Sequence, residues 1–171
     1  LAEKGYVTIS TRISQHSVRE QQRTMMGERL WDLMRCVDLL VSRREVDPAR
    51  IGCAGNSLGG EMAMWLAAMD ERIAAIMSAG FLTSMDQLEE NHCRCWKFPG
   101  LRELVEFSDI YALTAPRPLM CQNGLQERPT WFTVPLAREA LAGIKPNDEI
   151  LNYLCRLVAD KLRPETGSRK A

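Results

Sequence analysis

The residues best suited to chemistry form the run Gly55-Asn56-Ser57-Leu58-Gly59-Gly60, which fits the pattern G-x-S-x-G. In this pattern the serine acts as a nucleophile when it stands on a sharp turn between a strand and a helix. Such a turn strains the backbone at the serine and brings the residues on either side of it close together. Gly55 and Gly59 suit that close approach, and Gly60 lets the following helix pack against the sheet. We therefore predict that Ser57 stands on a strained strand-to-helix turn.

A serine on such a turn can attack the carbonyl carbon of an ester. The amide of Leu58 would then lie at the N-terminus of the helix, where backbone donors and the helix dipole stabilise a developing oxyanion. A glycine-rich turn with an idle serine is the alternative interpretation. A phosphate-binding loop fits poorly, because no Gly-Lys-Ser/Thr follows the glycines.

The segments on both sides of Ser57 have the character that this turn requires. Short apolar runs predict strands, and longer runs with apolar residues at steps of three and four predict helices. The expected strands are 6–10, 50–55, 73–79 and 118–123, and the expected helices are 24–43, 58–69, 133–142 and 148–162. Strands that alternate with helices indicate an α/β fold, with a mostly parallel sheet and helices on both faces.

The length favours one domain, spanning residues 1–171. Residues 81–116 carry no strong period and are expected to form a lid-like excursion over one face of the sheet. Residues 165–171 are expected to be a frayed tail.

The charge balance argues against nucleic acids and membranes as partners. Lys+Arg and Asp+Glu each number 22, so the chain has no excess positive charge that would attract a polyanion. The longest uncharged stretch is the 13 residues 73–85, whereas a membrane-spanning helix needs about 20 apolar residues. Because no signal peptide is visible and the thiols are expected to be free, we expect a cytoplasmic location.

The cysteines are too sparse for a disulfide scaffold, with six in 171 residues, so we expect buried or half-buried free thiols. His92, Cys93 and Cys95 lie close together in the sequence, and their side chains are of the kinds that bind metal ions. Their spacing is not C-x2-C, and no second ligand pair follows at the spacing of a zinc site. We therefore expect no metal at this cluster.

Several stretches together resemble the α/β-hydrolase fold, within the branch of acetyl xylan esterase and dienelactone hydrolase-like enzymes. The stretches are 46–52 (VDPARIG), 55–60 (GNSLGG), 70–73 (DERI), 99–101 (PGL), 109–110 (DI), 115–119 (APRPL) and 123–124 (NG). The resemblance covers about residues 1–142. It implies a serine hydrolase of carboxylic esters, often acetyl esters on sugars, that uses neither a metal nor an organic cofactor.

The resemblance also implies that an acid and then a histidine follow the nucleophile along the chain. The acid normally stands in a Gly-x-x-Asp pattern after the strand that follows the excursion, and here Gly124-Leu125-Gln126-Glu127 places Glu127 there. Glu127 is the only carboxylate between Asp109 and Glu139. An ordinary solvated loop glutamate is the alternative interpretation of this residue.

The histidine that the resemblance implies does not follow Glu127. The two histidines, His16 and His92, both precede it. His16 follows the first expected strand and His92 lies in the excursion. We interpret both as ordinary loop histidines, because a general base must come within hydrogen-bond reach of Ser57. The base is therefore unassigned.

The resemblance also places the family's third strand, with its second oxyanion donor, before Leu1. The fold is thus expected to be incomplete at both ends, and open strand edges invite self-association. The favoured function is a serine carboxylesterase of the acetyl esterase type, acting on a small acyl ester such as an acetylated sugar. The alternative is a truncated or degenerate hydrolase domain without catalysis that serves in binding or assembly.

Overall fold

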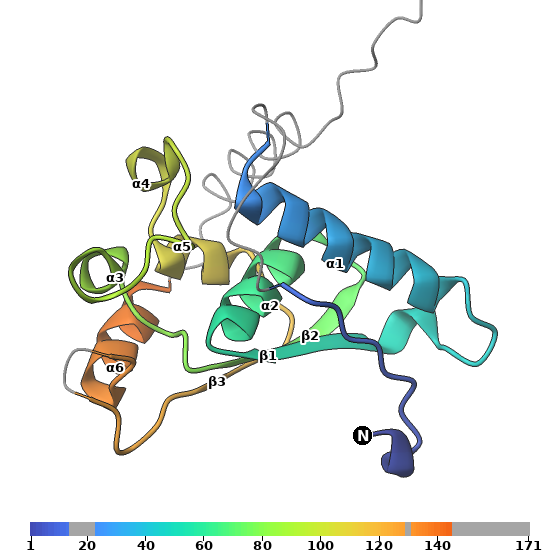
Figure 1. The fold of residues 1–171 in the computed structure, drawn as a ribbon. Coiled ribbons are helices and arrows are strands. Elements are labelled where there is room, and N and C mark those ends of the chain that lie inside the picture. Colours follow the sequence, from blue (N-terminus) through green and yellow to red (C-terminus); the bar gives the residue numbers. More distant parts are fainter. Residues whose placement is uncertain (14–22, 129–130, 145–171) are drawn as a thin grey trace, which may run out of the picture.

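The centre of the molecule is a parallel sheet. The computed structural model describes residues 1–13, 23–128 and 131–144. The sheet has the order β1-β2-β3, with β1 at Ile51–Asn56, β2 at Ile73–Ala79 and β3 at Leu119–Gln122. In register, Ile76 of β2 lies between Cys53 and Leu119. All carboxyl ends of the strands therefore lie at one edge of the sheet (Figure 1).

The helices surround this sheet and the segments that connect its strands. The α-helices are α1 at Met25–Val41, α2 at Leu58–Met69, α3 at Met85–Asn91, α4 at Leu101–Leu104, α5 at Phe107–Ala112 and α6 at Val134–Gly143. Short 3-10 turns lie at η1, Ala2–Lys4, and η2, Pro48–Arg50. Among the described residues, no helix is both long enough and apolar enough to cross a membrane.

The predicted alternation of strands and helices is confirmed. The expected strands at 50–55, 73–79 and 118–123 correspond to β1, β2 and β3, and the expected helices at 24–43, 58–69 and 133–142 correspond to α1, α2 and α6. The expected helix at 148–162 and the expected tail at 165–171 lie outside the described residues.

The strand expected at 6–10 is wrong, because this segment has no regular secondary structure. Its apolar side chains lie in solvent: Tyr6 is 62% exposed and Val7 is 46% exposed. A β-branched run forms a strand only where a neighbouring strand accepts its backbone hydrogen bonds. In the described residues this segment is not paired with the sheet, whose strands are β1, β2 and β3.

The excursion at 81–116 is more regular than its sequence suggests. It contains α3, α4 and α5, and its side chains belong to the main hydrophobic core; Trp96 is 2% exposed and Phe107 is fully buried. Helices this short do not repeat an apolar period often enough for it to be recognised. Local capping starts α5 instead, through a capping box between Glu106 and Asp109.

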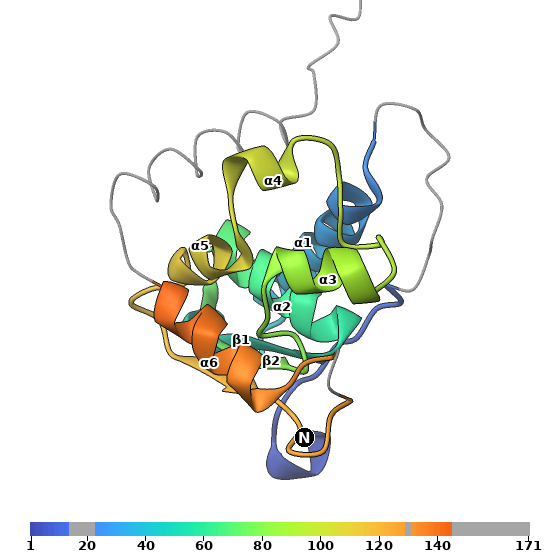
Figure 2. The same cartoon turned by 90° about the vertical axis from the view of Figure 1, so that its left-hand side faces the viewer.

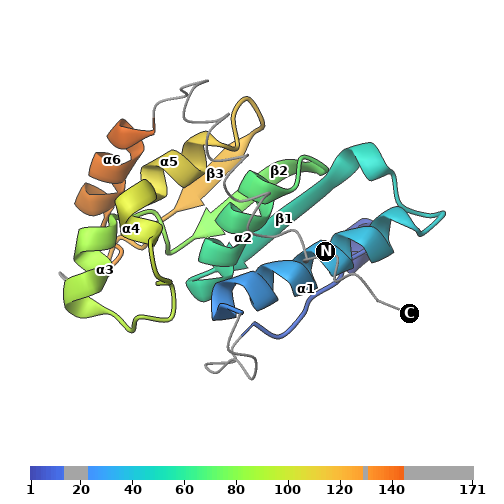
Figure 3. The ribbon, with the colours of Figure 1, turned by 90° about the horizontal axis from the view of Figure 1, so that it is seen from above.

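In the described residues α1, α2 and α5 lie over one face of the sheet (Figures 1 and 3). The helix expected at 148–162 lies outside those residues, so helices on both faces stay a prediction. α2 packs on β1 and β2, and α1 and α5 pack on α2. On the opposite face, Gly52 and Ala54 of β1 and Met120 of β3 are exposed. The alternation of burial along β1 and β3 therefore reflects a sheet whose other face is left exposed at these residues by the described part of the chain.

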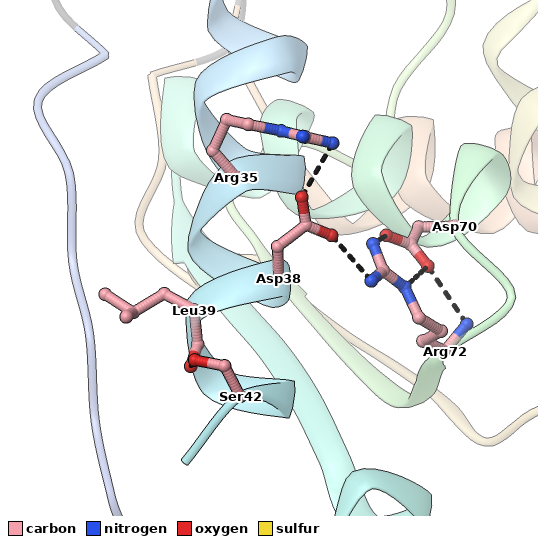
Figure 4. A network of polar contacts seen from close by, with 6 residues as sticks. All are labelled: Arg35, Asp38, Leu39, Ser42, Asp70 and Arg72. Atoms are coloured by element: carbon pink, nitrogen blue, oxygen red, sulfur yellow. Dashed lines mark hydrogen bonds and ion pairs between the residues drawn. The ribbon is translucent and has the colours of Figure 1, made fainter.

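A polar network joins α1 to the turn between α2 and β2 (Figure 4). Arg72 donates to the buried carboxylate of Asp70 at 2.6 Å and to Asp38 of α1 at 2.7 Å, and Arg35 pairs with Asp38 at 2.7 Å. The hydrogen bond from Arg72, aided by the charges of both arginines, lowers the pKa of Asp38. The network holds α1 beside the turn that leads into β2.

Candidate active site

The turn between β1 and α2 has the strained geometry predicted for Ser57. Ser57 has φ 55° and ψ −120°, and it is the only non-glycine residue with positive φ in the described part of the chain. Such angles cost about 1–3 kcal/mol, so the surrounding structure must enforce them. The Ser57 amide donates to Ala79 O of β2 at 2.8 Å, and the Ser57 carbonyl accepts from Glu61 N at 3.0 Å. These bonds anchor the turn to both β2 and α2.

The glycines around Ser57 have different reasons for lacking a side chain. A Cβ at Gly55 would lie 2.0 Å from Gly59 O, and a Cβ at Gly60 would lie 2.6 Å from Ala79 O. These clashes confirm the predicted close approach and the close packing of α2 on the sheet. A Cβ at Gly59, by contrast, would meet no atom within 4 Å. The close approach therefore excludes a side chain at Gly55 but not at Gly59.

The turn presents its groups at the carboxyl edge of the sheet, which faces the viewer in Figure 2 with α3 and α6 in front. Ser57 is exposed and Leu58, the first residue of α2, is half-buried. The amides of the first helical turn have no acceptor within the helix, so the Leu58 N–H is available to a ligand oxygen.

A cavity of about 170 Å³ opens beside Ser57. Its walls come from α2, from the excursion and from the segment before α6: Ser57, Leu58, Glu61, Phe81, Leu88, His92, Cys93, Cys95, Trp96 and Phe132. Most of this lining is apolar or aromatic. Three polar atoms of the lining, Glu61 Oε1, His92 Nε2 and Trp96 Nε1, are buried without a hydrogen-bond partner. Buried polar atoms without partners are costly, so they are candidates to bind a ligand or water.

Glu61 contributes the most buried of these groups, with a relative exposure of 1%. Burial raises the pKa of Glu61 to about 8, although the positive charge of Arg29 opposes the shift. The side chain is therefore predominantly a neutral carboxylic acid at pH 7, able to donate as well as accept a hydrogen bond. Glu61 is not among the site residues predicted from the sequence. The pattern that could have indicated it is a single charged residue within the otherwise apolar helix 58–69.

His92 lies on the same cavity, at the end of α3. Its ring packs against Phe132 and Trp131, with centroid distances of 5.0 Å and 5.7 Å. No hydrogen bond joins it to Ser57, so the geometry leaves the general base unassigned. The other histidine, His16, lies outside the described residues.

Glu127 is placed away from this cavity lining. It follows β3, at the carboxyl edge of the sheet where Ser57 follows β1. Its side chain folds back over Gly124, where an added Cβ would lie 2.4 Å from Glu127 Oε1. Glu127 does not line the cavity beside Ser57. Its role as the catalytic acid therefore stays a prediction.

The cluster of His92, Cys93 and Cys95 brings the two sulfur atoms together but does not form a set of metal ligands. The two Sγ atoms lie 2.6 Å apart, and both cysteines are free thiols. Among the described residues, no group of three or more His, Cys, Asp or Glu side chains is arranged to hold a metal ion.

Comparison with known proteins relates this geometry to hydrolases. The family model for Peptidase_S9, the prolyl oligopeptidase family, matches residues 3–125. The protein named "Putative hydrolase YtaP" from Bacillus subtilis (strain 168) is 33% identical over 115 residues, which are 63% of this chain and 38% of that protein. The chain therefore spans well under half of the length of this relative.

Solved structures of glucuronoyl esterases share the fold. The enzyme from Solibacter usitatus aligns with a TM-score of 0.61 at 19% identity, covering 84% of this chain and 40% of that one. The catalytic domain from Hypocrea jecorina aligns with a TM-score of 0.57 at 18% identity, covering 72% of this chain and 41% of that one. At these identities the likeness shows the fold alone, and it confirms the predicted α/β-hydrolase architecture.

Proposed function

The chain belongs to the prolyl oligopeptidase family, and from that premise we propose that it carries the nucleophile half of a serine ester hydrolase site. The observation that supports this proposal is the positive φ of Ser57 on a turn that opens into a small cavity. A serine without a function would not be expected to occupy backbone angles that lower stability. A nucleophilic serine benefits from them, because the sharp turn exposes its Oγ to substrate.

In the proposed reaction Ser57 Oγ attacks the carbonyl carbon of the ester. The carbonyl oxygen takes up the negative charge and accepts a hydrogen bond from Leu58 N–H at the start of α2. The C–O bond to the alcohol then breaks, the alcohol leaves with a proton, and water hydrolyses the acyl-serine. A general base must take the Ser57 proton. Glu127 is the proposed acid that would orient such a base.

The proposed substrate is an ester of a small acid, such as the acetyl group of an acetylated sugar. A cavity of about 170 Å³ with Phe81, Leu88 and Phe132 in its walls suits a small acyl group. Unpaired Glu61 Oε1 and Trp96 Nε1 offer polar contacts to a substrate that carries hydroxyl or carbonyl groups.

A non-catalytic role is the second candidate. It is favoured by the missing hydrogen bond between Ser57 and any base among the described residues. In that case the chain would serve as a binding or assembly module, and Ser57 would have the high pKa of an ordinary alcohol.

Labelling with a fluorophosphonate probe, followed by mass spectrometry, separates the two candidates. We expect the probe to modify Ser57, and we expect Ser57→Ala to lose the label while Ser42→Ala, at the exposed end of α1, retains it. Attack on the phosphorus atom of the probe also needs a base, and the described residues place none within a hydrogen bond of Ser57. We therefore expect the labelling to be slow and the hydrolysis of p-nitrophenyl acetate to be close to background, with both dependent on Ser57. A Ser57-dependent turnover of about 1–100 per second would instead show that a base is in place. Equal labelling of wild type and Ser57→Ala would contradict the proposal.

A further inference from the structure

The loop after α3 brings two thiols into closer contact than any other cysteine pair in the described residues. Cys93 Sγ and Cys95 Sγ lie 2.6 Å apart, in a sequence in which a single arginine separates the two cysteines. A disulfide bond has an S–S distance of about 2.0 Å. The two sulfur atoms are therefore already in contact before any bond forms.

The backbone around these cysteines is anchored, so their approach does not depend on free rotation of an exposed loop. Arg29 Nη1 of α1 donates to Cys95 O at 3.1 Å. Lys97 N donates to Arg94 O at 3.2 Å and closes a turn that contains Cys95, and Trp96, the residue after Cys95, is buried in the core. These contacts fix the backbone on the Cys95 side of the pair.

The two thiols differ in access to a dissolved oxidant. Cys93 is exposed, whereas Cys95 is half-buried. Burial, together with the hydrogen bond and the charge of Cys93, raises the pKa of Cys95 to about 12. Burial likewise raises the pKa of Cys53 to about 12 and that of Cys121 to about 11. What distinguishes Cys95 from these two cysteines is its contact with Cys93 Sγ. Cys93 is the one exposed cysteine of the described residues, and it is therefore the first to meet an oxidant.

We propose that Cys93 and Cys95 form an oxidisable dithiol, a modification site on the wall of the cavity beside Ser57. The oxidant is a peroxide. The Cys93 thiolate attacks one oxygen of hydrogen peroxide, the O–O bond breaks, and hydroxide leaves to give the Cys93 sulfenic acid. The Cys95 sulfur then attacks Cys93 Sγ and displaces hydroxide, which takes up the Cys95 proton. Overall, two thiols and one hydrogen peroxide give one disulfide and two waters.

The consequence of the modification is local to the cavity. Both cysteines line it, on either side of Arg94 and between His92 and Trp96. The disulfide would remove two S–H groups from the wall and close the loop covalently. The proposal does not depend on Ser57 being a nucleophile.

The test is to count free thiols by mass spectrometry. The reduced chain is treated with hydrogen peroxide, and the reaction is quenched. The chain is then unfolded in the presence of iodoacetamide, which alkylates free thiols. Its intact mass is measured, and its proteolytic peptides are mapped. The untreated chain should carry six alkyl groups, one for each cysteine. The treated chain should carry two fewer, with an intact Cys93–Cys95 disulfide in one peptide, and dithiothreitol should restore the full count.

Two variants make the result specific. Cys95→Ser should lose the paired oxidation and retain a sulfenic acid at Cys93 that dimedone traps. Cys36→Ser, which changes a half-buried cysteine on α1, should still lose two alkyl groups after peroxide. Thermal unfolding of each variant checks that the loop is still anchored. Full alkylation after peroxide, or a disulfide that involves a cysteine other than Cys93 and Cys95, would overturn the proposal.

Discussion

At the scale of single residues, the candidate site combines a strained serine with buried polar atoms that have no partner. Ser57 occupies backbone angles that its own side chain disfavours. Glu61, His92 and Trp96 each place a polar atom without a partner in or beside the same cavity. Each feature costs stability, and the proposed function explains why both occur at one place.

The titration of Glu61 provides a test of this buried carboxyl. Glu61 ionises near pH 4.5 when solvated and near pH 8 in the folded chain. Between these values the folded state holds more protons than the unfolded state, so the free energy of unfolding falls as pH rises. Glu61→Gln removes this pH-dependent contribution to the free energy of unfolding, because glutamine does not ionise. We expect the variant to gain stability relative to wild type from pH 5 to pH 8, measured by urea unfolding.

A control for this prediction is Glu45→Gln. Arg43 lowers the pKa of Glu45, which is exposed, so this carboxyl is ionised in both states above about pH 5. Its substitution should change stability by the same small amount at pH 5 and pH 8. A pH-independent difference for Glu61→Gln would show that Glu61 is not a neutral buried acid.

At the scale of elements, the junction of β1 and α2 is shaped by sterics that differ between neighbouring glycines. Gly55→Ala would place a Cβ 2.0 Å from Gly59 O, which forces the turn open, whereas Gly59→Ala meets nothing within 4 Å. We expect Gly55→Ala to lower the free energy of unfolding by about 1–3 kcal/mol. Gly59→Ala is the matched control and should be near neutral. Urea unfolding of both variants checks this, and equal losses would contradict the geometry.

The segment 115–119 shows how one side chain can connect several elements. Arg117 donates to Ala67 O of α2 at 2.7 Å, to Ile73 O of β2 at 3.0 Å and to Leu113 O after α5 at 3.2 Å. The guanidinium thereby donates to carbonyl oxygens at the ends of two helices. These carbonyls have no N–H donor within their own helices. The stretch APRPL, which supported the resemblance, thus has a structural role at the start of β3.

At the scale of the whole molecule, the sheet is open on one face and along the outer edge of β1 in the described residues. Unpaired backbone groups and exposed apolar side chains favour pairing with other chains. We propose that this chain, taken alone, self-associates through the sheet. Light scattering should give a mass above that of the monomer that rises with concentration.

The contribution of the open face is tested by a charge placed on it. Met120 of β3 is 55% exposed, and Met120→Lys should shift the population toward monomer. Leu39 of α1 is 52% exposed on another surface, so Leu39→Lys is the matched control and should leave association unchanged. A monomeric wild type, or an equal effect of both variants, would contradict the proposal.

Features that depend on neighbours along the chain could be predicted from the amino-acid sequence. The apolar runs of β1, β2 and β3, the helical periods of α1 and α6, and the strained turn at Ser57 are all local patterns, and the structure confirms them. Steric limits on φ and ψ act within a few residues, so the spacing of the glycines was sufficient to predict the turn.

Features that depend on residues far apart in sequence emerged only with the folded chain. Residues 6–10 form no strand, because a strand needs hydrogen bonds to a neighbouring strand and the described structure does not pair this segment with the sheet. The tertiary structure placed Glu61, His92 and the Cys93–Cys95 pair around Ser57, and folded Glu127 over Gly124 instead. Burial, pKa and sulfur contact are set by distances through space, and spacing along a chain does not encode those distances.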